Sequence, residues 1–306
     1  MGKTITQESC ANVLVVATTP RLPDGQVDLE GCRGNVEFLI DNGVDYIMPQ
    51  CGTGLVYDST LAEFEAVVGA FVEAAAGRAF IVPGIGPGYG RSLEMGHIAQ
   101  GLQVAGVMIM PIVGPASARG AYNGLKSIVE KVQLSTVLYQ RRLDIMPVDE
   151  VVELCAIDAV VGLKYAVDDL DSFKRINDRA GGQAAMVCGM AEDPCIDYMA
   201  AGAVGFSSGM ANFVPRMSLT ILRAFAGGQR QRAEQLRQQM VPFEDFRGER
   251  GARYSGSALH AAMEVAGLAG GPVIPFAEDV DPGDRPRVET MMKALLATEK
   301  ILREEV

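Results

Sequence analysis

The sequence has few of the features that bind nucleic acid. Its 306 residues include 27 lysines and arginines against 38 aspartates and glutamates, which gives a formal net charge of −11. Nucleic acid binds by releasing counterions to a basic surface, so this charge balance predicts no nucleic-acid partner. An anionic small molecule is still compatible with the sequence, because a local cluster of cations is enough to bind it.

Metal-binding motifs are also missing. Only two histidines, His97 and His260, are present, and both fall in stretches with helical periodicity, where we expect surface or packing roles. None of the residue spacings typical of zinc or calcium sites occurs. We therefore expect no protein-bound metal and no cofactor.

The sequence has no C-x-x-C pair, because its six cysteines are scattered along the chain. Residues 1–16 show no signal-peptide layout, and no apolar run approaches the roughly 18 residues that cross a membrane. These observations predict a reduced, cytoplasmic protein with no membrane partner.

What the sequence does have is a regular series of short apolar runs. Most are separated by a stretch of helical periodicity, such as 61–75, and runs that are apolar on both faces are typical of parallel strands covered by helices. Eight alternations of strand and helix predict an α/β protein with a (β/α)8 TIM barrel. The eight runs occupy residues 12–18, 45–49, 79–84, 106–111, 135–139, 159–164, 184–189 and 203–208.

The C-terminal third of the sequence has a different pattern. No further strand is expected beyond Asn212, and the remaining periodicity is helical. We assign residues 1–226 to a catalytic barrel with its closing helix and residues 227–306 to a helical C-terminal extension. The helices are expected at 215–226, 229–240, 257–266 and 286–302.

Lys164 is the only one of the seven lysines on a predicted strand, and it ends the apolar run 159–164. In parallel barrels the reactive groups lie at the carboxyl ends of strands. Burial favours the neutral amine, which is the form that attacks a carbonyl carbon to give a Schiff base. An ion pair with Asp168 or another loop carboxylate is an equally compatible interpretation.

Two further strand ends carry candidate groups. Tyr139 ends the neighbouring run 135–139, so its phenol can face the same mouth as Lys164 and transfer protons, or it can anchor the rim through its hydroxyl. The glycine-rich stretch 51–55 offers backbone N–H groups and the Thr53 hydroxyl to a carboxylate. An ordinary tight turn is the alternative for that stretch.

Taken together, these segments resemble the dihydrodipicolinate synthase / N-acetylneuraminate lyase family of Schiff-base-forming (β/α)8 lyases. The segments that carry the resemblance are "VDLEGCRGNVEFLIDNGVDYIMPQCGTG", "YQR", "VVGLKYAVDDL" and "CGMAEDPCIDYMAAGAVGFSSGMANFVP". The resemblance implies that Lys164 forms the imine with a 2-oxo acid substrate and that Tyr139 transfers the protons. It implies a homo-oligomer, a dimer or tetramer, as the assembly. It also implies substrate contacts at Gly52, Thr53 and Gly54 for the carboxylate. Near the imine it implies a backbone contact at Phe206 and a contact at Ser207.

Departures from the family pattern narrow the expected reaction. Gly52 replaces the first threonine of the carboxylate loop, and Leu55 stands where a glutamate is usual, so the loop resembles that of the 5-dehydro-4-deoxyglucarate dehydratase branch. Members that make dihydrodipicolinate have a second tyrosine where this chain has Ile112 and Val113, and an arginine about where it has Asp144. Lysine biosynthesis is therefore not the expected role.

The "YQRR" segment at 139–142 resembles the Tyr-Asn-Arg of the dehydratase branch. By that resemblance Arg141 would bind the distal carboxylate of a sugar diacid in a bidentate manner. A structural salt bridge for Arg141 or Arg142 is the alternative. The favoured hypothesis is a lyase that dehydrates a keto-deoxy sugar acid.

Three other functions remain compatible with the sequence. The first is a pyruvate-dependent aldolase or a dihydrodipicolinate synthase-like condensation. The second is a barrel enzyme without an imine, in which residues 203–212 cradle a phosphate. The third is a non-catalytic sensor of 2-oxo acids that retains the pocket.

Overall fold

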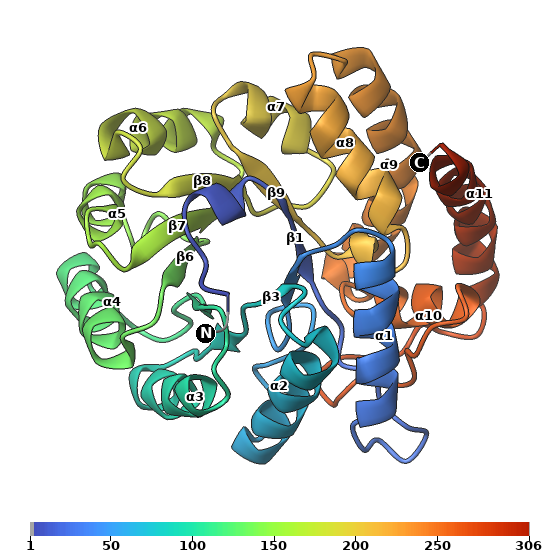
Figure 1. Ribbon diagram of the computed structural model, residues 1–306, viewed down its shortest axis with the longest axis horizontal. Helices are drawn as coiled ribbons and strands as arrows, with labels where there is room; N and C mark the ends of the chain where they lie inside the picture. Colours follow the sequence, from blue (N-terminus) through green and yellow to red (C-terminus); the bar gives the residue numbers. More distant parts are fainter. Residues whose placement is uncertain (1–2, 306) are drawn as a thin grey trace.

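The strands of the structure run parallel in one curled sheet, and helices cover its outer face (Figure 1). The computed structural model describes residues 3–305. The strand order in the sheet is β3-β2-β1-β9-β8-β7-β6-β5-β4. The strands are β1 (Val13–Val16), β2 (Tyr46–Met48), β3 (Phe80–Ile81), β4 (Gly84–Ile85), β5 (Val107–Ile109), β6 (Thr136–Gln140), β7 (Val160–Tyr165), β8 (Ala185–Cys188) and β9 (Gly205–Ser208).

The two edges of the sheet, β3 and β4, belong to one extended segment, residues 80–85. On one side of this segment the Val82 N–H donates to the Ile47 carbonyl at 2.9 Å, next to β2. On the other side the Ile85 carbonyl accepts from the Met110 N–H at 2.9 Å, next to β5. Each of the eight predicted apolar runs overlaps a strand, and the expected parallel α/β sheet is confirmed.

The covering helices follow from capped, amphipathic stretches of sequence. In α2 (Leu61–Ala75), the Thr60 hydroxyl accepts the Glu63 N–H at 3.1 Å while the Glu63 carboxylate accepts the Thr60 N–H at 3.0 Å. Phe64 and Phe71 of α2 are buried, so its apolar face packs on the sheet. The other covering helices are α1 (Leu29–Asp41), α3 (Tyr89–Gly101), α4 (Ala118–Val132), α5 (Val148–Cys155), α6 (Leu170–Ala180), α7 (Cys195–Ala200) and α8 (Pro215–Ala226). No helix within residues 3–305 combines the length and the apolar character needed to cross a membrane.

The amino ends of the strands are filled by the start of the chain. Ile5 and Cys10 are buried there, the latter in the short 3-10 helix Glu8–Cys10. A Cβ added to Gly106 would lie 2.5 Å from the Ile5 side chain, and one added to Gly162 would lie 3.0 Å from the Cys10 sulfur. Glycine therefore permits this close approach, and the opposite end of the sheet is left for a cavity.

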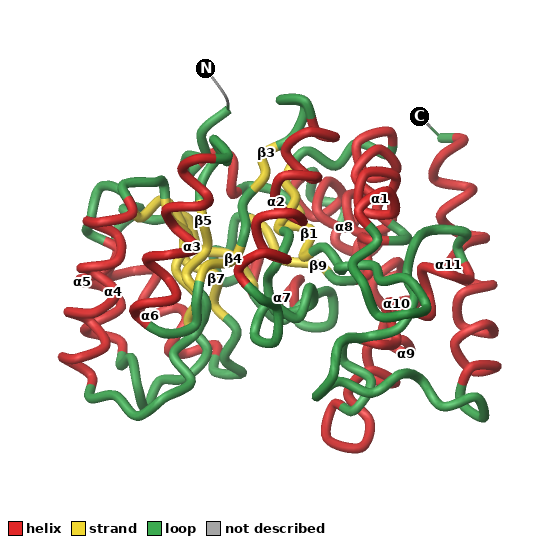
Figure 2. The backbone as a smooth tube through the Cα atoms, turned by 90° about the horizontal axis from the view of Figure 1, so that it is seen from below, coloured by secondary structure: helices red, strands yellow, loops and turns green. Residues whose placement is uncertain are grey.

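The C-terminal helices lie together beyond α8 and α1, at one side of the sheet and its ring of helices (Figure 2). The helix predicted at 229–240 is longer in the structure, where it continues past Pro242 to Gly248, before a kink at the non-helical residues Glu249, Arg250 and Gly251. Phe243 and Phe246 are fully buried in this continuation, so their packing outweighs the backbone hydrogen bond that the proline removes. The helices are α9 (Arg230–Ala252), α10 (Ser257–Val265) and α11 (Arg285–Glu304).

Candidate active site

A cavity of about 360 Å³ opens at the carboxyl ends of the strands. Strand pairing sets its central feature, because Tyr139 on β6 and Lys164 on β7 are direct neighbours in the parallel register. Six candidate residues line this cavity, namely Lys164, Tyr139, Gly52, Thr53, Arg141 and Ser207. Gly54 and Phe206 are not part of the lining.

Lys164 is 4% exposed, between the buried Leu163 and Tyr165 of β7. Its Nζ donates to the Gly189 carbonyl at 3.1 Å and lies 3.7 Å from the centroid of the Tyr139 ring. Asp168 makes no ion pair with Lys164 in the part of the chain that the structure describes. The amine therefore faces a carbonyl oxygen and an aromatic ring, and it lies beside the open space of the cavity.

The Tyr139 phenol is electrostatically coupled to this lysine. Burial alone would raise the pKa of Tyr139, but the positive charges of Lys164 and then Arg141 outweigh burial and lower it from its ordinary value. A phenol with a lowered pKa gives up and regains a proton more easily at neutral pH. Tyr139 is thus suited to move protons next to the Lys164 amine.

Hydrogen bonds of Thr19, which follows β1, and of Gln50 hold the loop after β2 in place. The Thr19 hydroxyl donates to the Gly54 carbonyl at 3.1 Å and accepts from the Gln50 side-chain amide at 2.9 Å. A Cβ on Gly54 would lie 3.0 Å from the Ala17 carbonyl, whereas one on Gly52 would meet nothing within 4 Å. Gly54 therefore seats the loop on the sheet, and Gly52 leaves the cavity side open.

Leu55, which replaces the glutamate usual in the family pattern, does not line the cavity. Its backbone is left-handed, with φ of +55°, a conformation that costs a non-glycine residue energy. Its side chain points to Gly256, where an added Cβ would lie 3.6 Å from the leucine methyl carbon. Leu55 thus packs the loop against the C-terminal part of the chain.

Arg141 and Arg142 follow β6 but have different environments. Arg142 donates to both carboxylate oxygens of Asp144, at 3.0 and 2.5 Å, and so forms a surface salt bridge. Arg141 lines the cavity, and within residues 3–305 no carboxylate pairs with it. The positive charge of Arg141 is therefore available to a ligand.

Tyr57 is a cavity residue that the sequence did not reveal. Burial first, and then the charge of Tyr139, raises the pKa of the Tyr57 phenol to about 12. Tyr57 therefore stays protonated near neutral pH, and its pKa is shifted in the opposite direction from that of Tyr139. Its only sequence signal is its position two residues beyond the glycine-rich loop.

Ser207 and Ser208 on β9 point to opposite sides, as successive residues of a strand do. Ser207 lines the cavity, whereas the Ser208 hydroxyl donates to the buried Glu192 carboxyl at 2.5 Å. Ser218 of α8 donates to the same carboxyl oxygen at 2.6 Å. Burial, followed by the nearby charge of Glu244, raises the pKa of Glu192 to about 7. The Phe206 side chain is fully buried, and the backbone contact implied at this residue stays a prediction.

One side of the cavity comes from the C-terminal helices, which the sequence suggested only as an extension. Glu244 and Arg247 of α9 and Ser255 of the following turn line it. We call these three residues the helical wall, and we call Lys164, Tyr139 and Ser207 the strand wall. The helical wall was missed because its residues lie far from every predicted strand end in the sequence.

The charge of the cavity is mainly positive. Lys164, Arg141 and Arg247 face a single carboxylate in its lining, that of Glu244. Such a surface is complementary to a small anion, and free guanidinium groups bind carboxylates well. Among residues 3–305 no three histidine, cysteine or carboxylate side chains are grouped so that they could hold a metal ion.

The chain is similar to known proteins over most of its length. Residues 9–295 match the Dihydrodipicolinate synthetase family. The "Probable 5-dehydro-4-deoxyglucarate dehydratase" of Bacillus subtilis is 28% identical over 264 residues, 84% of this chain and 85% of that protein. The "Probable 5-dehydro-4-deoxyglucarate dehydratase 2" of Streptomyces avermitilis is 30% identical over 254 residues, 82% of this chain and 76% of that protein. The crystal structure of dihydrodipicolinate synthase from Oceanobacillus iheyensis is similar with a TM-score of 0.91 and 29% identity, covering 95% of this chain and 98% of that one.

Proposed function

The chain belongs to the dihydrodipicolinate synthetase family and is a lyase, and from that premise we propose that it forms a Schiff base with a 2-oxo acid and dehydrates a keto-deoxy sugar acid. The family resemblance seen in the motifs is thereby confirmed. One observation carries the proposal. The Lys164 amine is buried in a cavity with excess positive charge, next to a tyrosine whose pKa is lowered.

The first proposed step joins the lysine to the substrate. The Lys164 amine attacks the carbonyl carbon of the 2-oxo acid to give a carbinolamine. The carbinolamine hydroxyl takes the proton of the Tyr139 phenol and leaves as water, which gives a protonated imine and a Tyr139 phenolate. The substrate carboxylate beside this carbon would lie against the loop of Gly52 and Thr53, which offers backbone N–H groups and a hydroxyl. The imine then withdraws electrons from the neighbouring carbon.

The second proposed step breaks the carbon–oxygen bond. The Tyr139 phenolate removes a proton from the carbon next to the imine, which leaves an enamine. The enamine expels the hydroxyl of the following carbon, and that hydroxyl takes the proton from Tyr139 and leaves as water. Hydrolysis of the imine then releases the product and restores the Lys164 amine.

The far end of the substrate is assigned to Arg141. Its guanidinium faces the cavity and is not neutralised by Asp144, which pairs with Arg142 instead. A distal carboxylate would accept two parallel hydrogen bonds from this group. The relatives named as 5-dehydro-4-deoxyglucarate dehydratases therefore suggest the substrate class, a sugar-derived 2-oxo diacid.

Condensation of pyruvate with an aldehyde is the second candidate, favoured by the similarity to the dihydrodipicolinate synthase from Oceanobacillus iheyensis. It shares the imine with the dehydratase reaction but needs a second substrate. Ile112 and Val113 stand where synthases have their second tyrosine, and Val113 is exposed outside the cavity. This difference favours dehydration.

We further propose that the curled sheet closes as a (β/α)8 barrel through residues 80–85, which hydrogen-bond to strands on both sides. In this proposal residues 1–226 form the catalytic barrel and residues 227–306 an extension that completes the cavity. The protein would act in the cytoplasm as a homo-oligomer, a dimer or tetramer. The six cysteines are all buried and unpaired, as in a reduced compartment.

Borohydride trapping tests the proposed chemistry. The protein is incubated with pyruvate or 5-dehydro-4-deoxyglucarate, reduced with borohydride, and examined by intact mass and peptide mapping. We expect one adduct, on Lys164, in the wild type and in the surface variant Lys174→Ala, and none in Lys164→Ala. Product formation without any aldehyde separates dehydration from condensation. An unmodified Lys164 at saturating substrate, with turnover unchanged in Lys164→Ala, contradicts the proposal.

A further inference from the structure

The helical wall contains an ion pair that the proposed chemistry does not use. The Arg247 Nη1 donates to both carboxylate oxygens of Glu244 at 2.8 Å. The Arg247 Nε and Nη2 donate to the Ser255 carbonyl at 3.0 and 2.9 Å. The two side chains are only 13% and 16% exposed, and both line the cavity. The pair is therefore a fixed feature of the cavity, unlike a mobile surface salt bridge.

The chemistry of this pair differs from that of Arg141. A guanidinium has five N–H donors, and the four hydrogen bonds of Arg247 leave one of them, on Nη2, without a partner within the protein. The Glu244 carboxylate has about four acceptor sites, of which Arg247 uses two. The pair thus offers a donor and acceptors side by side with little net charge. A hydroxyl group, which both donates and accepts, matches this arrangement better than a carboxylate does.

The pair also lies on the opposite side of Lys164 from Arg141. Arg141 follows β6, which pairs with one side of β7, the strand of Lys164. The Arg247 guanidinium lies next to Gly209, just beyond β9, which is two strands from β7 on its other side. There, a Cβ on Gly209 would lie 3.4 Å from the Arg247 Nη1, so glycine leaves room for the guanidinium. A ligand fixed at Lys164 would therefore have a free cation on one side and the neutral pair on the other.

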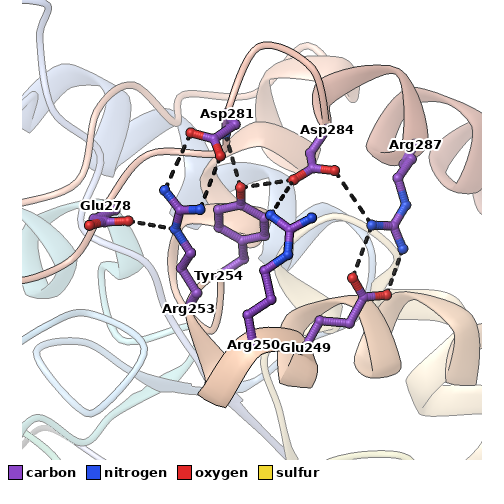
Figure 3. Close-up of polar contacts among 8 residues, drawn as sticks. All are labelled: Glu249, Arg250, Arg253, Tyr254, Glu278, Asp281, Asp284 and Arg287. Atoms are coloured by element: carbon purple, nitrogen blue, oxygen red, sulfur yellow. Dashed lines mark hydrogen bonds and ion pairs between the residues drawn. The ribbon is translucent and has the colours of Figure 1, made fainter.

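A polar network outside the cavity holds the segment that carries this pair (Figure 3). Arg253 donates to Glu278 at 2.5 Å and to Asp281 at 3.0 Å, while the Tyr254 hydroxyl donates to Asp284 at 2.9 Å. These contacts tie the turn after α9 to the loop that precedes α11. Ser255 directly follows Tyr254, so the network sets the position of the carbonyl that orients Arg247.

We propose that Glu244 and Arg247 are specificity-determining residues that bind the hydroxyl groups of the substrate chain. This inference rests on the proposed function, since it assigns a further part of the same substrate. It predicts that the protein distinguishes two six-carbon 2-oxo diacids of equal charge, one with hydroxyls and one without. The loss of hydrogen bonds to charged groups predicts a difference in affinity of about tenfold or more.

The test compares 5-dehydro-4-deoxyglucarate with 2-oxoadipate by calorimetry in a Lys164→Ala background, in which the proposed turnover cannot consume the ligand. We expect the hydroxylated acid to bind about tenfold more tightly. Adding Glu244→Gln or Arg247→Lys removes most of this preference and changes the affinity for 2-oxoadipate less than about threefold. Glu234→Gln is the matched control, since Glu234 and Arg237 form an ion pair of the same spacing on α9 away from the cavity.

Each outcome bears on one claim. The inference about the pair is overturned if folded Glu244→Gln protein still binds the hydroxylated acid more tightly than 2-oxoadipate. It is also overturned if the Lys164→Ala protein shows no such difference in affinity before Glu244→Gln is added. Thermal unfolding shows whether the variants are folded. If Arg247→Lys does not fold, the comparison is made with Glu244→Gln alone. Borohydride trapping of pyruvate on the otherwise unaltered protein reports the imine separately, so a failed trap overturns the proposed function and leaves the calorimetric comparison valid.

Discussion

The strand wall and the helical wall of the cavity are held in place by different means. Lys164 and Tyr139 lie side by side in a parallel ladder, within strands that are paired on both sides. Glu244 and Arg247 lie on a helix outside the sheet, and their orientation depends on the Ser255 carbonyl and on ion pairs between the C-terminal segments. Backbone pairing between strands thus fixes the geometry of the strand wall, whereas hydrogen bonds and ion pairs of side chains fix that of the helical wall.

This difference suggests a division of roles. Bond making and breaking require atoms placed to within a fraction of an ångström, which paired strands provide. Recognition of a variable substrate chain can be carried by side chains on an attached helix, because changing them leaves the strands intact. Substitutions in the strand wall should therefore reduce the rate of chemistry, while substitutions in the helical wall should change which ligand is preferred.

Tyr139→Phe should have the largest effect. It removes the hydroxyl that moves protons but keeps the ring beside Lys164, so we expect turnover to fall by about 100- to 10,000-fold. Imine trapping on Lys164 should persist, though more slowly. Tyr57→Phe is the matched control, because that phenol lines the same cavity with its pKa raised to about 12. Equal losses of turnover in both variants, measured as product formed, would show that Tyr139 has no special role in proton transfer.

Glu192 lies behind the cavity, between β9 and α8, and provides the second prediction. Its carboxyl is bound by Ser208 of β9 and Ser218 of α8, and it lies near Glu244 of α9 and the buried thiols of Cys188 and Cys195. Burial, and then the charge of Glu244, raises its pKa from 4.5 to about 7. The folded protein therefore keeps this proton at pH values where the unfolded chain has lost it.

The sign of the pH effect follows from that shift. The contribution of Glu192 to stability is fully present below about pH 4.5 and is lost as the pH rises through about 7, a change on the order of 3 kcal/mol. Glu192→Gln should flatten this decline in denaturant unfolding measured between pH 5 and 8. Glu234→Gln should not, since hydrogen bonding to Arg237 lowers the pKa of Glu234. An unchanged decline in Glu192→Gln protein would assign the pH dependence to other groups.

The strand wall could be predicted from the sequence because its signals are local. An apolar run marks each strand, and a residue near the carboxyl end of a strand can reach the mouth, which is how Lys164 and Tyr139 were found. Each of them is the last residue but one of its strand. Their direct pairing then follows from the parallel order of neighbouring strands. The pairing of Arg142 with Asp144 could not be decided in advance, because it depends on the conformation of an exposed loop.

The helical wall could not be predicted because no local pattern encodes it. The sequence pattern predicts a helix at 229–240, but with Phe243 and Phe246 buried the helix continues to Gly248, where a kink follows. That continuation brings Glu244 to the cavity. Tertiary packing determines where α9 ends, and the periodicity of the sequence does not reveal contacts between distant segments.

Arg141 and Arg142 allow the smallest and most specific comparison, because they are neighbours with the same side chain. Arg141→Met removes an unpaired cation from the cavity, so we expect the KM for 5-dehydro-4-deoxyglucarate to rise about tenfold. Arg142→Met breaks an exposed salt bridge with Asp144, which is worth little, and should change the KM less than about twofold.

Pyruvate sharpens this comparison because it has no distal carboxylate. If Arg141 binds only the far end of the diacid, Arg141→Met leaves the half-saturating pyruvate concentration in borohydride trapping unchanged. Weaker trapping of pyruvate in Arg141→Met than in Arg142→Met would instead place Arg141 at the reacting end of the substrate. The lowered pKa of Tyr139, to which the Arg141 charge contributes, would then be the route by which Arg141 acts.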